Sequence, residues 1–194
     1  MTAILAPTAS RRLVLTLGLG YLSLLLVALT LAIGPLALLT RDRNPPNLDL
    51  RRDFGIWAAV TGLLHAVFGL QLHMSGDWLR YFFERTGHGL RLLTSLFGLS
   101  NHLGLVATFL LILLLALSND ASLRRLSGQT WKRLQQSNYA LAALILGHTL
   151  TSQVLTKRSA SLRIVVAGLA LVTLAAQAAG IVRYRRRNKT SPES

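Results

Sequence analysis

The sequence contains no cysteine among its 194 residues. Disulfides, thiolate metal sites, iron–sulfur clusters and cysteine nucleophiles are therefore excluded. Charged residues are also scarce: they make up 14% of the chain, whereas a soluble domain has roughly 25%. Hydrophobic residues account for 52%. A soluble enzyme is therefore not expected, and the high apolar content also excludes a disordered chain.

The formal net charge of +14 would suggest a nucleic-acid-binding protein if the basic residues formed one surface. They lie instead in short segments between five long runs without a charged residue, and we expect no nucleic-acid partner. A bilayer core about 30 Å thick needs roughly 20 apolar residues in a helix, and each run has at least 19 residues. The runs are Leu13–Thr40, Phe54–Gly76, Leu92–Asn119, Leu134–Thr156 and Ile164–Val182.

The fold predicted from these runs is an all-α integral membrane bundle that forms one domain in the lipid bilayer. The first run is longer than the apolar region of a signal peptide and ends without a small-residue cleavage site, so we interpret it as a span. The third run opens with polar residues, and its span is expected to start near His102. The predicted spans are 13–40, 54–75, 102–118, 136–156 and 164–182, followed by a short basic tail at 183–194.

The distribution of basic residues predicts the orientation of the bundle, because cytoplasmic loops carry an excess of lysine and arginine. With five spans, the first loop, the third loop and the C-terminal tail lie on one side and carry 13 basic residues, whereas the other side carries eight. We therefore expect a multi-pass protein of the cell (inner) membrane with a cytoplasmic C-terminus and an external N-terminus.

Polar side chains at membrane depth are costly and usually functional. No acidic residue, lysine or arginine lies within the five runs, which disfavours an ion-coupled transporter. At 1.5 Å per residue, His65 lies about 18 Å into the second predicted span and His148 about 15 Å into the fourth. Two imidazoles at similar depth on different helices suit axial ligation of a heme iron.

The residues around His65 are compatible with two roles. Gly62 and Gly69 lie at i−3 and i+4, on the same helical face, where they would leave a slot for a porphyrin. The same small residues also favour close helix packing, with each histidine donating a hydrogen bond across the bundle. From the pattern alone, both alternatives remain open. His73 and His102 could form a second heme site at the outer end, although each is also typical of an interfacial residue.

Two short patterns point to a known family. Arg51 and Arg52, then Gly55 and His65 ten residues later, are similar to the Arg-Arg-x-Leu-Gly opening of a heme-carrying helix. A second pattern resembles the signature Trp-(Lys/Arg)-x-Leu-His…Tyr…His and is carried by Trp131, Lys132, Leu134, Gln135, Tyr139 and His148. Both belong to the ferric reductase-like transmembrane domain family. The resemblance covers roughly residues 25–185 and is closest to the MsrQ-type heme-binding subunit of the methionine-sulfoxide reductase system.

The resemblance implies an oxidoreductase subunit with a b-type heme whose iron is bound by His65 and His148. We expect one heme per chain, because Gln135, His73 and His102 are poor candidates for a second site. Arg51 and Arg52 would contact the heme propionates, although positive-inside bias explains them equally well. Gln135 stands where the family pattern has a histidine. An amide is a poor heme ligand, so Gln135 is expected to bond near a quinone head group or a propionate.

The resemblance also implies electron transfer across the membrane to or from a partner redox protein. The 194 residues include no flavin or nicotinamide domain. We therefore expect electrons to come from a reductase or a quinol, with a quinone or flavin supplied by a partner. The alternative is a non-enzymatic membrane scaffold or assembly protein with the same bundle but no heme.

Overall fold

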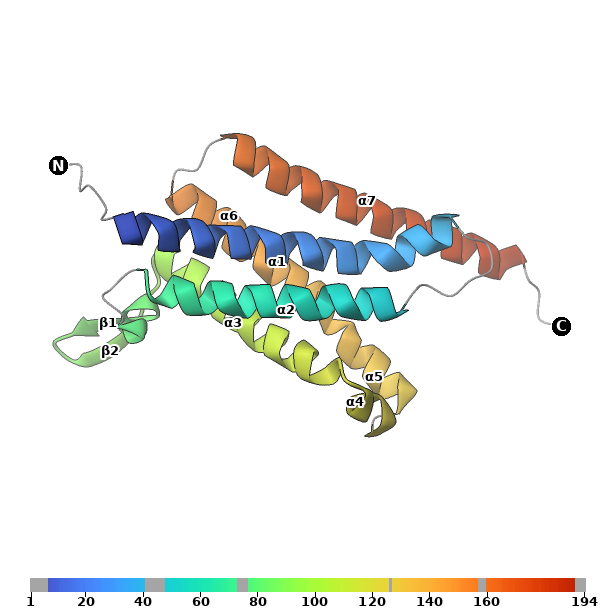
Figure 1. Ribbon diagram of the computed structural model, residues 1–194, viewed down its shortest axis with the longest axis horizontal. Helices are drawn as coiled ribbons and strands as arrows, with labels where there is room; N and C mark the ends of the chain where they lie inside the picture. Colours follow the sequence, from blue (N-terminus) through green and yellow to red (C-terminus); the bar gives the residue numbers. More distant parts are fainter. Residues whose placement is uncertain (1–6, 41–47, 73–76, 126, 157–159, 191–194) are drawn as a thin grey trace.

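The computed structural model describes residues 7–40, 48–72, 77–125, 127–156 and 160–190. Five long helices dominate the chain (Figure 1). They are α1 (Pro7–Thr40), α2 (Leu48–Leu70), α3 (Leu96–Leu117), α6 (Ser137–Leu155) and α7 (Ala160–Thr190). The predicted all-α membrane bundle is therefore confirmed.

Four of these helices, α1, α2, α3 and α7, are long and apolar enough to cross a membrane. The fourth predicted span, 136–156, corresponds closely to α6, whose 19 residues extend about 28 Å. The mean hydropathy of α6 is reduced by polar residues such as His148, Ser152 and Gln153, which line an internal cavity and do not have to face lipid. The five-span topology therefore stays a prediction. The length of α6 and its position in the sequence agree with it.

Helices α1, α2 and α7 begin before the predicted spans, at Pro7, Leu48 and Ala160. Three further ends also differ. The second predicted span extends to residue 75, but α2 ends at Leu70. The third begins not near His102 but at Leu96, because the Ser95 hydroxyl caps the helix by accepting the Gly98 N–H at 3.2 Å. The basic segment predicted as a tail from residue 183 continues α7 as far as Thr190.

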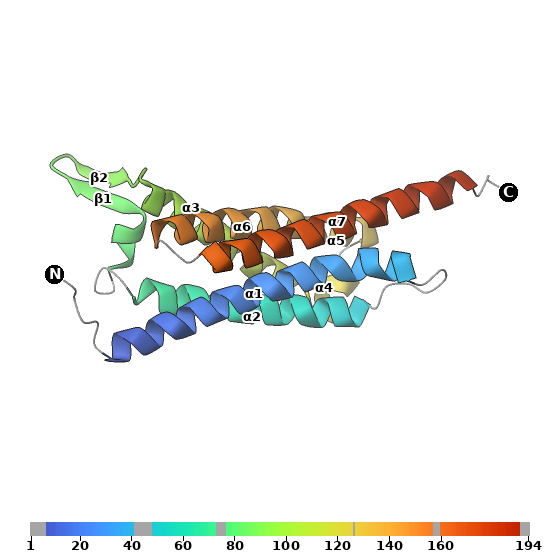
Figure 2. The same cartoon turned by 90° about the horizontal axis from the view of Figure 1, so that it is seen from above.

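The long helices form two packed pairs. Helix α1 packs along α2, and α3 packs along α6, while α7 covers α1. Figure 2 shows the pair α1 and α2 on one side of the molecule and α3 and α6 on the other. Ala58 and Ala59, each 1% exposed, allow close approach of the helices. The Ser23 hydroxyl donates to the Ala58 carbonyl at 2.8 Å and ties α1 to α2.

The outer surface of the bundle is apolar. On α7, for example, Val165, Leu171, Val172 and Leu174 are each more than 60% exposed. In water such a surface would drive aggregation, whereas lipid tails are as apolar as leucine and solvate it without cost. The exposed apolar surface therefore agrees with the bundle being an integral membrane protein.

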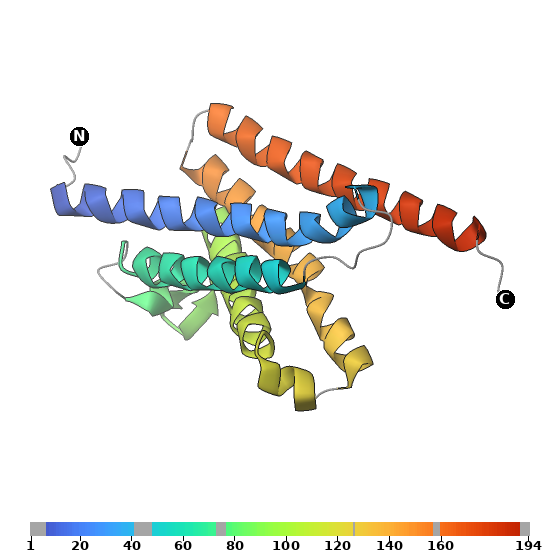
Figure 3. The same ribbon diagram turned by 45° about the vertical axis from the view of Figure 1, so that its right-hand side comes forward.

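Short elements lie at the two ends of the pair formed by α3 and α6. Helices α4 (Asp120–Arg125) and α5 (Gly128–Gln135) join α3 to α6 at one end (Figure 3). At the other end, the 3₁₀-helix η2 (Trp78–Tyr81) leads into an antiparallel hairpin of β1 (Phe83–Thr86) and β2 (Gly89–Leu92). This hairpin was not predicted from the sequence.

A proline in α1 is compensated by a side chain from α7. Pro35 has no N–H, so the carbonyl of Leu31, four residues earlier, loses its intrahelical partner. The Gln177 side-chain amide donates to this carbonyl at 2.6 Å, and its own oxygen accepts from the Tyr139 hydroxyl at 3.3 Å. Gly180 lies against Pro35, where a Cβ would come within 2.8 Å of the ring. Helix α7 therefore packs against the turn of α1 that contains Pro35.

We predict that Gln177→Leu lowers the free energy of unfolding by about 1 to 2 kcal/mol, because the Leu31 carbonyl is left without a donor in an apolar setting. Thermal unfolding in detergent would measure the loss. Thr173→Val is the matched control, since the Thr173 hydroxyl bonds only within its own helix, to Leu169 at 2.8 Å. Equal unfolding temperatures for the two variants would contradict this role of Gln177.

Candidate functional site

The structure brings His65 and His148 together across the two helix pairs. The ring centroids are 6.0 Å apart, and the ring planes make an angle of 72°. His65 lies five residues before the end of α2 and His148 seven residues before the end of α6. His65 therefore lies about 24 Å along α2 from Asp49, and the predicted mid-membrane depth of the two histidines stays a prediction.

Each imidazole is fixed by a backbone carbonyl of the neighbouring helix. Nδ1 of His65 lies 2.7 Å from the carbonyl oxygen of Thr16 on α1. Nδ1 of His148 lies 2.8 Å from the carbonyl oxygen of Ser100 on α3. A carbonyl oxygen only accepts, so Nδ1 must carry the proton in both rings. In the neutral ring Nε2 then has the free lone pair that a metal ligand needs.

Two glycines that were not predicted from the sequence make these contacts possible. A Cβ at Gly20 would lie 2.8 Å from Nδ1 of His65, and a Cβ at Gly104 would lie 3.0 Å from Nδ1 of His148. Each glycine follows the accepting residue by four positions, as Thr16-x-x-x-Gly20 and Ser100-x-x-x-Gly104. This repeated spacing is the signal by which the pair could have been found.

A cavity of about 330 Å³ surrounds the two histidines. It lies between the helix pairs, and α1, α2, α3 and α6 all contribute to its wall. Gly62 and Gly69, the predicted slot residues, both line it. Gly62 is also a packing position, since a Cβ there would lie 2.7 Å from Leu111 Cδ1. The cavity is within the range of about 300 to 1,000 Å³ that small-molecule sites occupy.

The donor set and its spacing fit a heme. Two metal–imidazole bonds of about 2 Å each, with the ring centroids roughly 1 Å further out on either side, give a separation of about 6 Å. The observed separation is 6.0 Å. Thr16 Oγ1 and Gln153 Oε1 are buried without a hydrogen-bond partner, and both residues line the cavity. Such unsatisfied polar atoms are compatible with a polar group of a ligand.

The residues around the histidine cavity can also be compared with the needs of a metal ion bound without a heme. Among the residues that the structure describes, no three or more His, Cys, Asp or Glu side chains form a group that could hold a metal ion. Axial ligation of a heme iron needs one or two side chains, because the porphyrin supplies the other ligands. The two histidines are therefore fewer than the donors that such a metal-ion group needs.

Arg51 and Arg52 do not lie at the histidine cavity. They line a second cavity of about 440 Å³ between the same helices, together with Asp49, Gln136 and Tyr139. Arg51 precedes His65 by 14 residues, or about 21 Å along α2. The predicted contact of Arg51 and Arg52 with the propionates of a heme at His65 stays a prediction.

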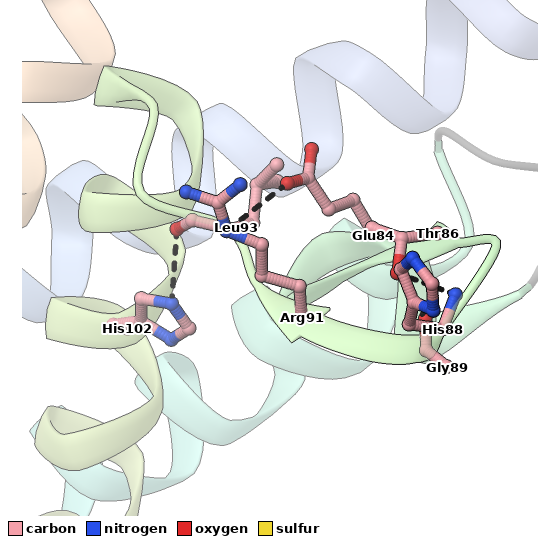
Figure 4. A network of polar contacts seen from close by, with 7 residues as sticks. All are labelled: Glu84, Thr86, His88, Gly89, Arg91, Leu93 and His102. Carbon is pink, nitrogen blue, oxygen red and sulfur yellow. Dashed lines mark hydrogen bonds and ion pairs between the residues drawn. The ribbon is translucent and has the colours of Figure 1, made fainter.

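The weaker candidate residues are placed as follows. His102 Nε2 lies 3.2 Å from the Leu93 carbonyl, and its ring packs on Phe82 at 5.7 Å, outside the histidine cavity (Figure 4). His73 lies outside the described residues, so the proposed second outer site has no described geometry. Gln135 ends α5, but its side chain is not described. His88 is exposed at the hairpin turn.

Comparison with known proteins identifies the class of this membrane bundle. Residues 19–146 match the family described as "Ferric reductase like transmembrane component". The match covers most of the chain and includes His65, and the protein belongs to this family. Membership of this family suggests that the protein has a role in membrane electron transfer. No solved structure matches the chain at a significant level.

Proposed function

We propose that the protein binds one heme b between His65 and His148 and transfers electrons across the membrane to or from a partner redox protein. The observation that carries the proposal is the spacing of the two imidazoles, 6.0 Å between centroids, with Nδ1 of each ring on a backbone carbonyl. Both contacts leave Nε2 as the metal-binding nitrogen.

The roles of the surrounding residues follow from their positions. His65 and His148 would supply the axial ligands, and Gly62 and Gly69 would leave room for the porphyrin between the helix pairs. When bound, the heme would supply a one-electron redox centre. Tyr81 is 4% exposed and lines the cavity, where its hydroxyl donates to the Gly69 carbonyl at 3.1 Å. Tyr81 thereby shields the end of the cavity near the hairpin from water.

We further propose that the protein is an MsrQ-type subunit of the cell (inner) membrane, with its C-terminus in the cytoplasm. A reductase or a quinol would donate electrons, through a quinone or a flavin that the partner supplies. The cavity that Arg51 and Arg52 line lies at the predicted cytoplasmic end, whereas the histidines lie near the other end. This placement favours an acceptor protein on the outer side.

Transfer across the bilayer is tested with sealed vesicles that contain the protein and trapped cytochrome c, with dithionite added outside. Heme-loaded vesicles are expected to reduce the trapped cytochrome c faster than protein-free vesicles. Vesicles with the double variant His65→Ala/His148→Ala are expected to match the protein-free rate. Equal rates for all three preparations would contradict electron transfer and favour the alternative, a scaffold with the same bundle.

We predict a stoichiometry of one heme per chain. His102 Nε2 is already occupied by the Leu93 carbonyl at 3.2 Å, and its ring packs on Phe82. The amide of Gln135 binds iron more weakly than an imidazole would. Pyridine hemochrome content, divided by protein mass, should therefore give a ratio near one that His102→Ala leaves unchanged. A ratio near two that His102→Ala halves would show that a second heme binds.

A further inference from the structure

The two helix pairs hold their histidines in the same way. In an α-helix each carbonyl accepts the N–H four residues further on, so the carbonyls of Thr16 and Ser100 point toward Gly20 and Gly104. Both carbonyls also accept a hydrogen bond from Nδ1 of a histidine of the neighbouring helix, at 2.7 and 2.8 Å. Each imidazole therefore lies directly beside a glycine.

We propose that Gly20 and Gly104 are positioning residues, which let His65 and His148 bond through Nδ1 to the backbone of the neighbouring helix and so direct Nε2 of both rings to one heme iron. This inference rests on the heme-binding function proposed above. It goes beyond that function, because it assigns the orientation of both ligands to two residues that do not themselves touch the iron.

A methyl group at either glycine would collide with the ring. At position 20 a Cβ would lie 2.8 Å from Nδ1 and 2.9 Å from Cε1 of His65. At position 104 the corresponding distances to His148 are 3.0 and 3.1 Å. The ring atoms have little freedom to yield, since Nδ1 is held on the carbonyl. Alanine would therefore move the ring off its acceptor and turn Nε2 away from the cavity.

The two ligands differ in one further contact. Ser100 Oγ lies 3.3 Å from Nδ1 of His148 and 2.7 Å from Ser152 Oγ. The corresponding hydroxyl on α1, Thr16 Oγ1, has no hydrogen-bond partner. The Nδ1–H of His148 thus has a second acceptor, which makes this imidazole the more electron-rich ligand. Ser100→Ala removes that acceptor without adding bulk.

The first test compares reconstituted variants by heme affinity and by midpoint potential. Gly20→Ala and Gly104→Ala are expected to lose at least about 10-fold in heme affinity, the lower end of the range for partners of metal ligands. Gly18→Ala and Gly168→Ala are the controls, because a Cβ at either position meets nothing within 4 Å. Ser100→Ala is expected to keep its heme but to raise the midpoint potential.

If Gly20 and Gly104 served general packing only, their replacement would lower the heme content but leave the midpoint potential of the bound heme unchanged. Unchanged affinity in Gly20→Ala and Gly104→Ala would overturn the proposal. If Gly104→Ala fails to fold, Gly20→Ala still tests the positioning role at His65.

The second test does not depend on heme. Protein labelled with ¹⁵N-histidine, without heme, should give imidazole signals of the Nδ1–H tautomer for His65 and His148. The Gly20→Ala variant should lose that signature for His65 and keep it for His148. Nε2–H signals in the unmodified protein would overturn the positioning role. Failure to bind heme with both Nδ1–H signals present would instead reject the proposed function and leave the backbone contact standing.

Discussion

Replacing His65 or His148 by alanine is expected to abolish the low-spin heme of the purified protein. In the proposed site two neutral imidazoles would occupy both axial positions, which would make the iron six-coordinate and low-spin. The rings are 6.0 Å apart, and among the described residues no other histidine lines the cavity. Those residues therefore offer no substitute imidazole. Visible spectra should show either no heme or a high-spin heme that binds carbon monoxide.

His88→Ala serves as the matched control, since His88 is exposed in the hairpin turn and lies outside the cavity. Its spectrum and heme content should equal those of the unmodified protein. A full low-spin spectrum in either His65→Ala or His148→Ala would eliminate this ligand pair.

The second large effect concerns topology. A reporter that is active only in the cytoplasm, fused after Ser194, is expected to be fully active, while the same reporter ahead of Met1 should be inactive. The expectation follows from 13 basic residues on the predicted cytoplasmic side against eight on the other. It also requires that α6 crosses the membrane, because an odd number of spans places the termini on opposite sides.

Reporters on the same side at both ends would contradict the five-span topology. Helix α6 would then be the first to reconsider, since it does not meet the length and hydropathy measure that α1, α2, α3 and α7 meet. A fusion in the segment between α6 and α7 would decide whether α6 crosses.

The sequence predicted the helices well because five charge-free runs, each with at least 19 residues, match the length of a membrane-spanning helix. It predicted their ends less well. Polar residues ahead of His102 indicated an interfacial segment, but Ser95 caps a helix that begins at Leu96. The hairpin of β1 and β2 was missed because its strands have four residues each and show no clear alternation of apolar and polar residues.

The histidine pair was predictable because a polar residue within an apolar span is conspicuous in a sequence. Gly20 and Gly104 were missed, since glycine is common in membrane helices and the meaning of their spacing depends on which helix packs against which. The sequence pointed instead to Gly62 and Gly69, which share a helix with His65. Periodicity describes one helix at a time, whereas the ring contacts come from the neighbouring helix.

Arg51 and Arg52 were associated with the histidines by sequence pattern, but the structure places them at another cavity. Their place in a family-like pattern associated them with the heme of His65, but about 21 Å of helix separates Arg51 from that histidine. They line a different cavity, which shares only Leu111 with the histidine cavity among the residues that line each. Leu111, which is 5% exposed, belongs to the wall of both cavities.

The central claim is that His65 and His148 bind one heme iron between them. The reduced-minus-oxidised absorption spectrum of the heme-reconstituted protein, recorded before and after addition of carbon monoxide, tests it most directly. Two axial imidazoles predict sharp, split α and β bands that carbon monoxide leaves unchanged, because no coordination position is open. A spectrum without heme bands, or a reduced heme that binds carbon monoxide, would contradict it.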